Sequence, residues 1–256
     1  MNQKPAEIPP FIDELPELDF QEFPKMARLN RDVVITEKID GTNAQILIVP
    51  VTAENNSAVA NPGICLCGDF LIRAGSRNRW LASGKQDNAG FAAWVSENRN
   101  DLVKLGPGRH FGEWWGRGIQ RNYGLDHRRF SLFNVGRWYI DADVSHYPGE
   151  EIDRWGRDLH NFPRVKIFSL ETNANGGTTT VEGPQCCHVV PTLWRGNFHD
   201  CKIERSLDLL RRGGSLAAPG FAKAEGIVIY HEAAKKCFKV TLENDESPKS
   251  LVTPGT

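Results

Sequence analysis

Short apolar runs with the composition of β-strands recur along this chain. β-Branched and aliphatic residues fill the stretch from Val33 to Val51, on both sides of the polar segment Lys38–Asn43, which contains turn-forming residues. This pattern predicts a strand, a turn and a second strand. Further strands are expected over Ile64–Ile72, Phe130–Val135, Val165–Leu170, Gly226–Tyr230 and Cys237–Leu242, and exposed loops over Glu54–Gly63 and Asn173–Thr180.

Two other segments place apolar residues at the spacing of one helix face. Asp87 or Asn88 can cap the first helix and Gly106 can end it, whereas the second helix covers Asp200–Arg212 and ends at Gly213. Several strands with two helices predict a single α+β domain. The expected helix faces are Phe91, Trp94, Val95, Leu102 and Leu105 in the first helix and Ile203, Leu207 and Leu210 in the second.

The distribution of prolines predicts where the folded domain begins. Five prolines lie within residues 1–24 and prevent a long helix there, so an irregular lead-in is expected. Neither a repeat nor a linker-like composition interrupts residues 25–246, which we therefore interpret as one domain followed by a short tail, 247–256.

The charge balance limits how the chain can contact nucleic acid. Lysine and arginine total 31 against 32 aspartates and glutamates, for a net charge of −1, which excludes binding through bulk positive charge. Any nucleic-acid contact must therefore be local. Hydrophobic residues at 40% and charged residues at 25% are typical of a folded soluble protein and argue against a disordered chain.

The sequence predicts neither a membrane span nor a secretory leader. Its longest mainly apolar run, Ala44–Val51, is far shorter than the ~20 residues a span needs, and the N-terminus lacks an apolar segment. We expect an intracellular, cytoplasmic protein with no membrane partner and with reduced cysteines. The cysteines and histidines between Cys186 and Cys201 lack the C-x₂₋₄-C spacing typical of zinc, so the sequence disfavours a metal site there without deciding the question.

One polar stretch carries candidate chemistry. Lys38 lies at the end of a predicted strand, between the carboxylates of Glu37 and Asp40. Gly41 follows and lets a phosphate approach the backbone. A free lysine has a pKa near 10.4 and is protonated, so covalent catalysis requires a site that supplies the deprotonated amine. Taken alone, a K-x-D-G turn is more often a solvated hairpin than an active site.

The motifs that follow in the chain strengthen this interpretation. In their order they resemble the motifs of the covalent nucleotidyltransferase superfamily, and in particular of ATP-dependent RNA ligases of the RNA ligase 2-like branch. The resemblance covers roughly Phe23 to Asp245 and implies an adenylyltransferase domain of twisted antiparallel sheets flanked by helices. The segments that carry it are Glu37–Asn43, Phe111–Gly116, Phe130–Val135, Glu225–Ile229 and Phe238–Leu242.

The resemblance implies a role for each motif. Lys38 would carry the adenylate, Glu113 would contact the ribose, and Glu225, with Glu113, would support Mg²⁺ or Mn²⁺. Phe133 would stack on adenine and Lys239 would contact the α-phosphate. The other residues implied as nucleotide contacts are Glu37, Ile39, Asn43 and Arg77, and those implied as supporting residues are Asp40, Gly41 and Lys236.

The activity implied by the resemblance is ATP-dependent RNA ligation. AMP would pass from ATP to Lys38 and then to a 5′-phosphate, and a 3′-hydroxyl would displace it to seal RNA ends or a nicked duplex. Two alternatives stay open. A minimal ATP-dependent DNA nick ligase would share every motif, and a catalytically weakened RNA-binding or scaffold protein would keep the same fold.

Two departures from the family pattern stand out. The fifth motif usually has a second lysine two positions after Lys239, whereas position 241 is threonine; Lys236 is close but should face the other side of the strand. Only 15 residues follow Thr241, too few for a C-terminal OB-fold. We therefore expect this domain or an accessory protein to hold the nucleic acid. The candidate contacts within the basic and aromatic segment Arg109–Arg129 are Arg117, Arg121, Arg128 and Arg129.

Overall fold

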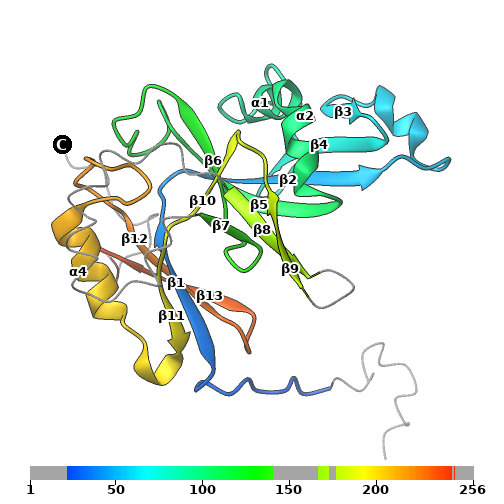
Figure 1. Ribbon diagram of the computed structural model, residues 1–256. Helices are drawn as coiled ribbons and strands as arrows, with labels where there is room; N and C mark the ends of the chain where they lie inside the picture. Colours follow the sequence, from blue (N-terminus) through cyan, green and yellow to red (C-terminus); the bar gives the residue numbers. More distant parts are fainter. Residues whose placement is uncertain (1–21, 141–166, 173–176, 244, 246–256) are drawn as a thin grey trace, which may run out of the picture.

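The computed structural model of the chain describes residues 22–140, 167–172, 177–243 and 245. In this part of the chain, strands from distant segments form two larger sheets and one small sheet, with few helices (Figure 1). The fold is therefore mixed α+β, as the sequence predicts. Within the described residues, no helix is long and apolar enough to cross a membrane.

The first larger sheet has four antiparallel strands in the order β11-β1-β12-β13. Its inner strand β1 places Val33 and Ile35 on one face, where they pack with Leu207 and Leu210 of helix α4 in one apolar cluster. Among the described elements, no helix lies over the opposite face of the sheet in Figure 1. The bounds are β1 (Asp32–Lys38), β11 (Thr192–Asn197), β12 (Gly226–His231), β13 (Lys236–Thr241) and α4 (Ile203–Gly213), with a short 3₁₀ turn η5 (Phe198–Asp200) before α4.

The second larger sheet has six strands in the order β10-β6-β5-β2-β4-β3, antiparallel except for the β10–β6 pair. Ala44, Ile46 and Ile48 of β2 are buried in a second apolar cluster that also contains residues of the short helices. The intervening residues of β2 point to the other, more open face. The bounds are β2 (Thr42–Pro50), β3 (Ile64–Cys67), β4 (Phe70–Ser76), β5 (Gly108–Gly116), β6 (Arg128–Leu132), β10 (Cys187–Val189), α1 (Phe91–Glu97), α2 (Arg99–Leu102), η1 (Asn56–Ala60) and η2 (Val103–Leu105).

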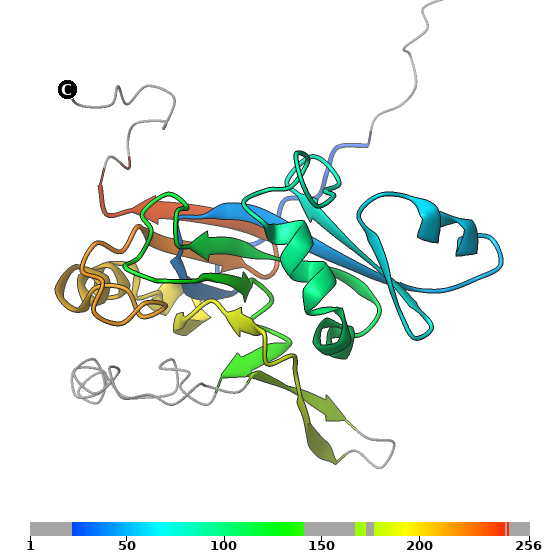
Figure 2. The ribbon, with the colours of Figure 1, turned by 90° about the horizontal axis from the view of Figure 1, so that it is seen from above.

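A small antiparallel sheet completes the fold. Its order is β7-β8-β9, and the hairpin of β8 and β9 projects from the body of the molecule (Figure 2). The bounds are β7 (Trp138–Ile140), β8 (Ile167–Thr172) and β9 (Thr178–Glu182).

Several elements differ from the sequence prediction. The expected strand Ile64–Ile72 is a hairpin, because Gly68 takes a φ of +54° between β3 and β4. The N-cap residue of the first helix is Gly90 instead of Asp87 or Asn88, although the Asp87 carboxylate accepts hydrogen bonds from the amides of Ala92 and Ala93 in its first turn. The helix is broken at Asn98 into two short pieces. Part of the predicted loop 173–180 is strand β9, whereas residues 173–176 lie outside the described part of the chain.

The predicted ends of the domain are only partly described. Residues 22–30 have no helix or strand, but residues 1–21, most of the predicted lead-in 1–24, lie outside the described residues. The tail 247–256 also lies outside them, so the predicted domain limits stay predictions.

Candidate active site

Lys38 lies at the junction of the two larger sheets. It is the last residue of β1, and after only three residues the chain enters β2 of the other sheet. The Nζ atom of Lys38 donates a hydrogen bond of 2.5 Å to Oε2 of Glu225, which precedes β12 and is buried. The sequence predicted a strand, a turn and a second strand here, and both strands, β1 and β2, are confirmed. Because they belong to different sheets, the intervening turn forms a crossing between sheets instead of a solvated hairpin.

Glu113 on β5 approaches the same junction from the six-stranded sheet. It pairs with Asn43 of β2, and its Oε1 accepts a hydrogen bond of 3.1 Å from the amide of Gly41. Burial raises the pKa of Glu113 to about 7, although the nearby charge of Lys38 and the Gly41 amide both lower it. The negative charges of Glu225 and Asp40 raise this pKa further. The site therefore gathers carboxylates around one lysine.

Gly41 has a packing role that the sequence did not reveal. A Cβ atom at this position would lie 2.6 Å from the carbonyl oxygen of Trp114 and 2.7 Å from Cβ of Trp115. The crossing segment can therefore lie directly against β5 only because residue 41 has no side chain. The phosphate approach predicted for this glycine stays a prediction.

Asp40 is held in position by the loop between β5 and β6, residues 117–127. The buried phenol of Tyr123 accepts a hydrogen bond of 2.7 Å from the amide of Asp40, and Arg121 donates one of 3.2 Å to the Asp40 carboxylate. The loop has unusual backbone conformations, with a positive φ at Gln120, Asn122 and Tyr123. These conformations place the side chains of Arg121 and Tyr123 against Asp40.

Glu37 points away from Lys38, to the face of the sheet that α4 covers. Its carboxylate accepts hydrogen bonds from the Ser215 hydroxyl at 2.5 Å and from the amides of Leu216 and Ala217 at 2.8 and 2.9 Å. Burial raises the pKa of Glu37 to about 7 against the lowering effect of these hydrogen bonds. The side chain therefore fastens the segment after α4 to the lysine strand, and the predicted nucleotide contact could come only from its backbone.

A cavity of about 1420 Å³ lies between the two sheets and opens beside Lys38. It brings together residues from nine of the strands and from the segments between them. The predicted site residues that line it are Glu37, Lys38, Ile39, Asp40, Gly41, Asn43, Arg77, Glu113, Phe133 and Lys239.

Strand register explains how the far wall of this cleft presents its side chains. Lys239 of β13 pairs with Val228, which in turn pairs with Thr36 of β1, so the three residues form one row on the cleft face. Lys236 pairs with His231 on the opposite face and is not among the residues that line the cleft. The structure thus separates the two lysines, as strand alternation predicts.

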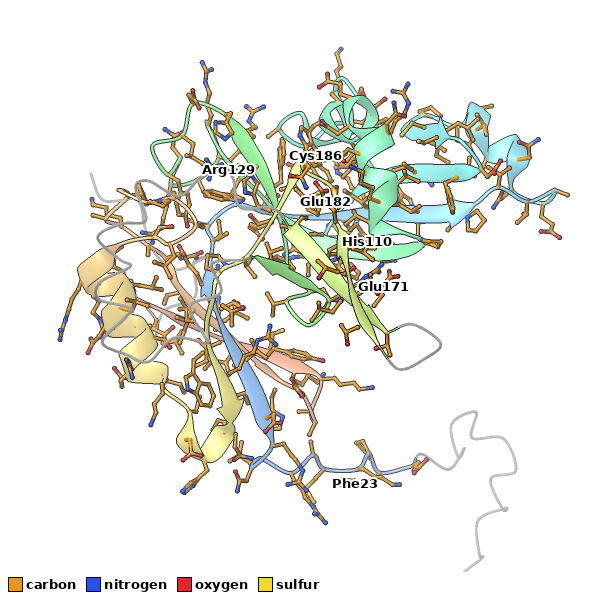
Figure 3. The ribbon with its side chains drawn as sticks, in the orientation of Figure 1. Phe23, His110, Arg129, Glu171, Glu182 and Cys186 are labelled. Atoms are coloured by element: carbon orange, nitrogen blue, oxygen red, sulfur yellow. The ribbon has the colours of Figure 1, made fainter. Side chains whose placement is uncertain are left out.

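The four arginines predicted to contact nucleic acid lie outside the cleft lining. Arg128 donates to the carbonyls of Arg117 and Ala89, and Arg129 donates to the carbonyl of Ala217. Arg129 lies on β6, beside the loop that holds Asp40 (Figure 3). Arg121 forms an ion pair with Asp40, so in the structure it supports the segment that follows Lys38.

Sequence reasoning missed several residues of the cleft. Phe111 lines it and is 48% exposed; because it lies two residues before Glu113 on one strand, strand alternation could have placed it on the same face. Arg109, which belongs to the predicted basic segment but was not assigned to the cleft, precedes it by a further two residues and also lines the cleft. Arg195 of β11 also lines the cleft, on a strand that was not predicted from the sequence.

The carboxylates at the junction could hold a divalent cation, whereas the cysteine and histidine cluster gains no support. Among the described residues, no group of three or more histidines, cysteines, aspartates or glutamates is close enough to hold a metal ion by itself. Mg²⁺ is commonly bound by one or two carboxylates together with substrate phosphates. Glu113 and Glu225, whose charges repel each other, fit that kind of site.

Comparison with known proteins gives one family and several structures. The sequence model of the family described as RNA ligase matches residues 31–241. A ligand-free lysine-to-alanine mutant of a Naegleria gruberi RNA ligase is 19% identical, covering 83% of this chain and 50% of its own, with a TM-score of 0.42. Another lysine-to-alanine mutant of Naegleria gruberi RNA ligase, with ATP and Mn, is 19% identical over 83% and 49%, with a TM-score of 0.43.

A glutamate-to-alanine mutant of the Naegleria gruberi enzyme, with AMP and Mn, is 18% identical over 83% of this chain and 50% of that one, with a TM-score of 0.41. The chain therefore spans about half the length of these structures. A search of curated proteins finds no match.

Proposed function

The chain belongs to the RNA ligase family, and we propose that it is an ATP-dependent ligase that joins RNA 5′-phosphate and 3′-hydroxyl ends through an adenylate on Lys38. The observation that carries this proposal is the meeting of Lys38, Glu113 and Glu225 at the junction of two sheets, beside a cleft of about 1420 Å³. These residues come from three motifs that are far apart in the sequence.

The first step would transfer AMP to the enzyme. Nζ of Lys38 attacks the α-phosphorus of ATP, a nitrogen–phosphorus bond forms, and the bond to the β-phosphate oxygen breaks to release pyrophosphate. The amine must first lose a proton, and Glu225, 2.5 Å from Nζ, is placed to accept it. Lys239, which lines the cleft one row away, is placed to neutralise charge on the α-phosphate.

The cleft offers contacts of the right kind for the rest of the nucleotide. Phe133 is 38% exposed at the cleft wall, so one face of its ring is available to a purine. Glu113 and Asn43, which pair across β5 and β2, supply acceptor and donor groups for the ribose.

Glu113 and Glu225 would hold Mg²⁺ or Mn²⁺ together with the ATP phosphates. Their mutual repulsion, which contributes to the raised pKa of Glu113, favours a cation between or beside them. When bound, the cation supplies positive charge against the phosphates during pyrophosphate release.

The later steps would use the same centre. A 5′-phosphate oxygen attacks the lysine-bound AMP and frees the amine, and a 3′-hydroxyl then attacks the resulting pyrophosphate-linked strand, forming a phosphodiester and releasing AMP. Each step exchanges one bond to phosphorus for another, so positioning and charge neutralisation supply most of the catalysis. RNA ends or a nicked duplex are the proposed substrates, with an accessory protein as a further proposed partner.

The test is incubation of the full chain with α-labelled ATP and Mg²⁺, followed by denaturing electrophoresis and mapping of the labelled peptide. We expect label on Lys38 in the native protein and none in Lys38→Ala. Label on another residue, or none in a folded native protein, would contradict the proposal. Sealing of nicked duplexes with a 3′-OH RNA or a 3′-OH DNA strand then distinguishes the RNA ligase from a DNA nick ligase, and RNA binding without adenylation would identify a scaffold protein.

A further inference from the structure

The open face of the six-stranded sheet carries a row of cations that extends away from Lys38. Strand pairing defines three successive rows on this face. Asn43 and Glu113 form the first, next to the lysine. Gln45 pairs with Phe111 on one side and Gly75 on the other, and Leu47 pairs with Arg109 and Arg73 in the same way. The arginine row is four residues further along β5 than Glu113, or about 13 Å.

Trp80 organises the arginine row. The guanidinium carbons of Arg73 and Arg109 lie 4.7 and 5.2 Å from the centre of its ring, at distances typical of cation–π contacts. Gly75 makes room for this indole, because a Cβ atom there would lie 3.1 Å from Cε3 of Trp80 and 2.9 Å from Cγ of Gln45. The sequence therefore builds an aromatic and basic platform on this face.

Among the residues that the structure describes, the arginines of this face have no carboxylate partners. Within the described residues, none of these arginines forms an ion pair. The Arg109 guanidinium instead donates a hydrogen bond of 2.5 Å to the amide oxygen of Gln45. Arg77 and Arg79, in the segment that follows β4, also line the cleft. By contrast, Arg121 is paired with Asp40 and Glu243. Arg79, Arg128 and Arg129 all donate to backbone carbonyls, but of these three only Arg79 lines the cleft. Uncompensated cations along an open groove favour a polyanion.

An exposed ring lies between the nucleotide end of the face and the arginines. Phe111 lines the cleft with 48% of its surface exposed, in the row between Glu113 and Arg109. An exposed ring with cations on one side of it is an arrangement that can stack a base of single-stranded nucleic acid while the cations bind the backbone.

We infer that this face, consisting of Phe111, Arg109, Arg79 and the Trp80 platform, binds an RNA strand as it leaves the cleft. The inference rests on the proposed function for the position of the strand end at Lys38. A base stacks on Phe111, and the phosphates that follow it contact Arg109 and Arg79. The loop and strand that contain Arg117 and Arg128 then contribute little to strand binding.

Charge-neutralising variants test the inference. Arg79→Gln and Arg109→Gln, separately and together, are compared with Arg117→Gln/Arg128→Gln and with Arg212→Gln, which removes a charge from α4 on the far side of the other sheet. The affinity of each full-length variant for a fluorescent single-stranded RNA is measured at several salt concentrations, and its adenylation is measured with ATP alone. Thermal unfolding verifies that each variant is folded.

We expect Arg79→Gln and Arg109→Gln each to weaken RNA binding by up to about fivefold and to lower the slope of log affinity against log salt by about 0.7. Adenylation stays unchanged. Phe111→Leu, which keeps an apolar side chain, should weaken binding by at least about fivefold without changing the slope. Arg212→Gln should match the native protein.

Normal RNA affinity and slope in the Arg79→Gln/Arg109→Gln variant would overturn the inference, as would a loss confined to Arg117→Gln/Arg128→Gln. These measurements do not require catalysis. If the native protein failed to adenylate Lys38, the proposed function would fail, while the RNA affinities would still decide the role of this face.

Discussion

Lys38 and Thr241 lie on either side of Gly226 in one row of the four-stranded sheet, Lys38 on β1 and Thr241 on β13. A side chain cannot stand between them, because a Cβ atom at Gly226 would lie 2.2 Å from the carbonyl oxygen of Val240. The Thr241 hydroxyl donates to the carbonyl of Glu243 and to the Asp245 carboxylate. The position at which the family usually has a second lysine is thus held by a local turn.

Thr241→Lys should accelerate lysine adenylation by about tenfold. Two strand spacings of about 4.8 Å separate positions 38 and 241, so a lysine side chain at 241 can reach a phosphate bound beside Lys38. Single-turnover adenylation with labelled ATP measures the rate. Thr241→Val removes the hydroxyl without adding charge and should not accelerate the reaction; a rate gain in that variant would show that release of the turn, and not charge, is responsible.

Lys38→Ala should lower the free energy of unfolding by about 1–3 kcal/mol, because it leaves the buried carboxylate of Glu225 without its ammonium partner. A substrate-facing lysine alone would predict almost no effect. Urea unfolding measures the change. Lys38→Ala combined with Glu225→Gln should recover most of the lost stability but no adenylation, and equal stability of Lys38→Ala and native protein would show that the pair contributes nothing.

Glu225→Gln and Glu113→Gln should respond differently to Mg²⁺. If Glu225 supports the cation, higher Mg²⁺ can partly replace the lost affinity by mass action. Glu113 also accepts the amide of Gly41, so its loss disturbs the crossing segment at every Mg²⁺ concentration. Adenylation rates across a Mg²⁺ titration separate the two effects, and superimposable curves would remove the distinction between these roles.

The stability of the protein should depend on pH through Glu113. Burial raises its folded pKa to about 7 from an ordinary value of 4.5. Between these values the folded state keeps a proton that the unfolded chain has released, so this contribution to stability falls as pH rises through the window and stays low above it. Urea unfolding between about pH 5 and 8 should show a loss that is smaller by about 1–3 kcal/mol in Glu113→Gln, in which Glu37, whose pKa is also raised to about 7, still contributes. Parallel profiles for the two proteins would contradict the shift.

Arg121→Ala should slow adenylation by about tenfold or more, because Arg121 holds the Asp40 carboxylate two residues after the nucleophile. Arg117→Ala, an exposed arginine of the same loop, should leave the rate unchanged and serves as the matched control. Single-turnover rates at saturating ATP provide the comparison. Equal rates in both variants would mean that Tyr123, which accepts the Asp40 amide, positions the segment alone.

The sequence predicted the site better than it predicted the surroundings of the site. Motif order placed Lys38, Glu113, Phe133 and Lys239 on strands or strand ends, and the structure brings all four to one cleft. Strand alternation also separated Lys239 from Lys236 correctly. The separation of the two lysines has a local cause, because the period of a strand fixes which neighbouring side chains share a face. The four motif residues were expected together only from the family resemblance, and their roles stay predictions.

What the sequence could not predict depends on long-range contacts. Glu37 lies beside the nucleophile in the chain, yet its carboxylate binds Ser215 and two amides of a segment almost 180 residues later. The partnership of Arg121 and Asp40 also follows from the loop conformation, not from a motif. The first predicted helix was too long because the pattern of apolar residues continues through Asn98, where the backbone does not.

The two separate apolar clusters have a consequence for how the protein unfolds. One cluster lies under each larger sheet, and the nucleophile segment connects them across the cleft. Each half can therefore lose its packing as a cooperative unit of its own, with opening energies that differ between the halves. A nucleotide that contacts both walls would join these units, so hydrogen exchange in the two sheets should become synchronised once the cleft is filled.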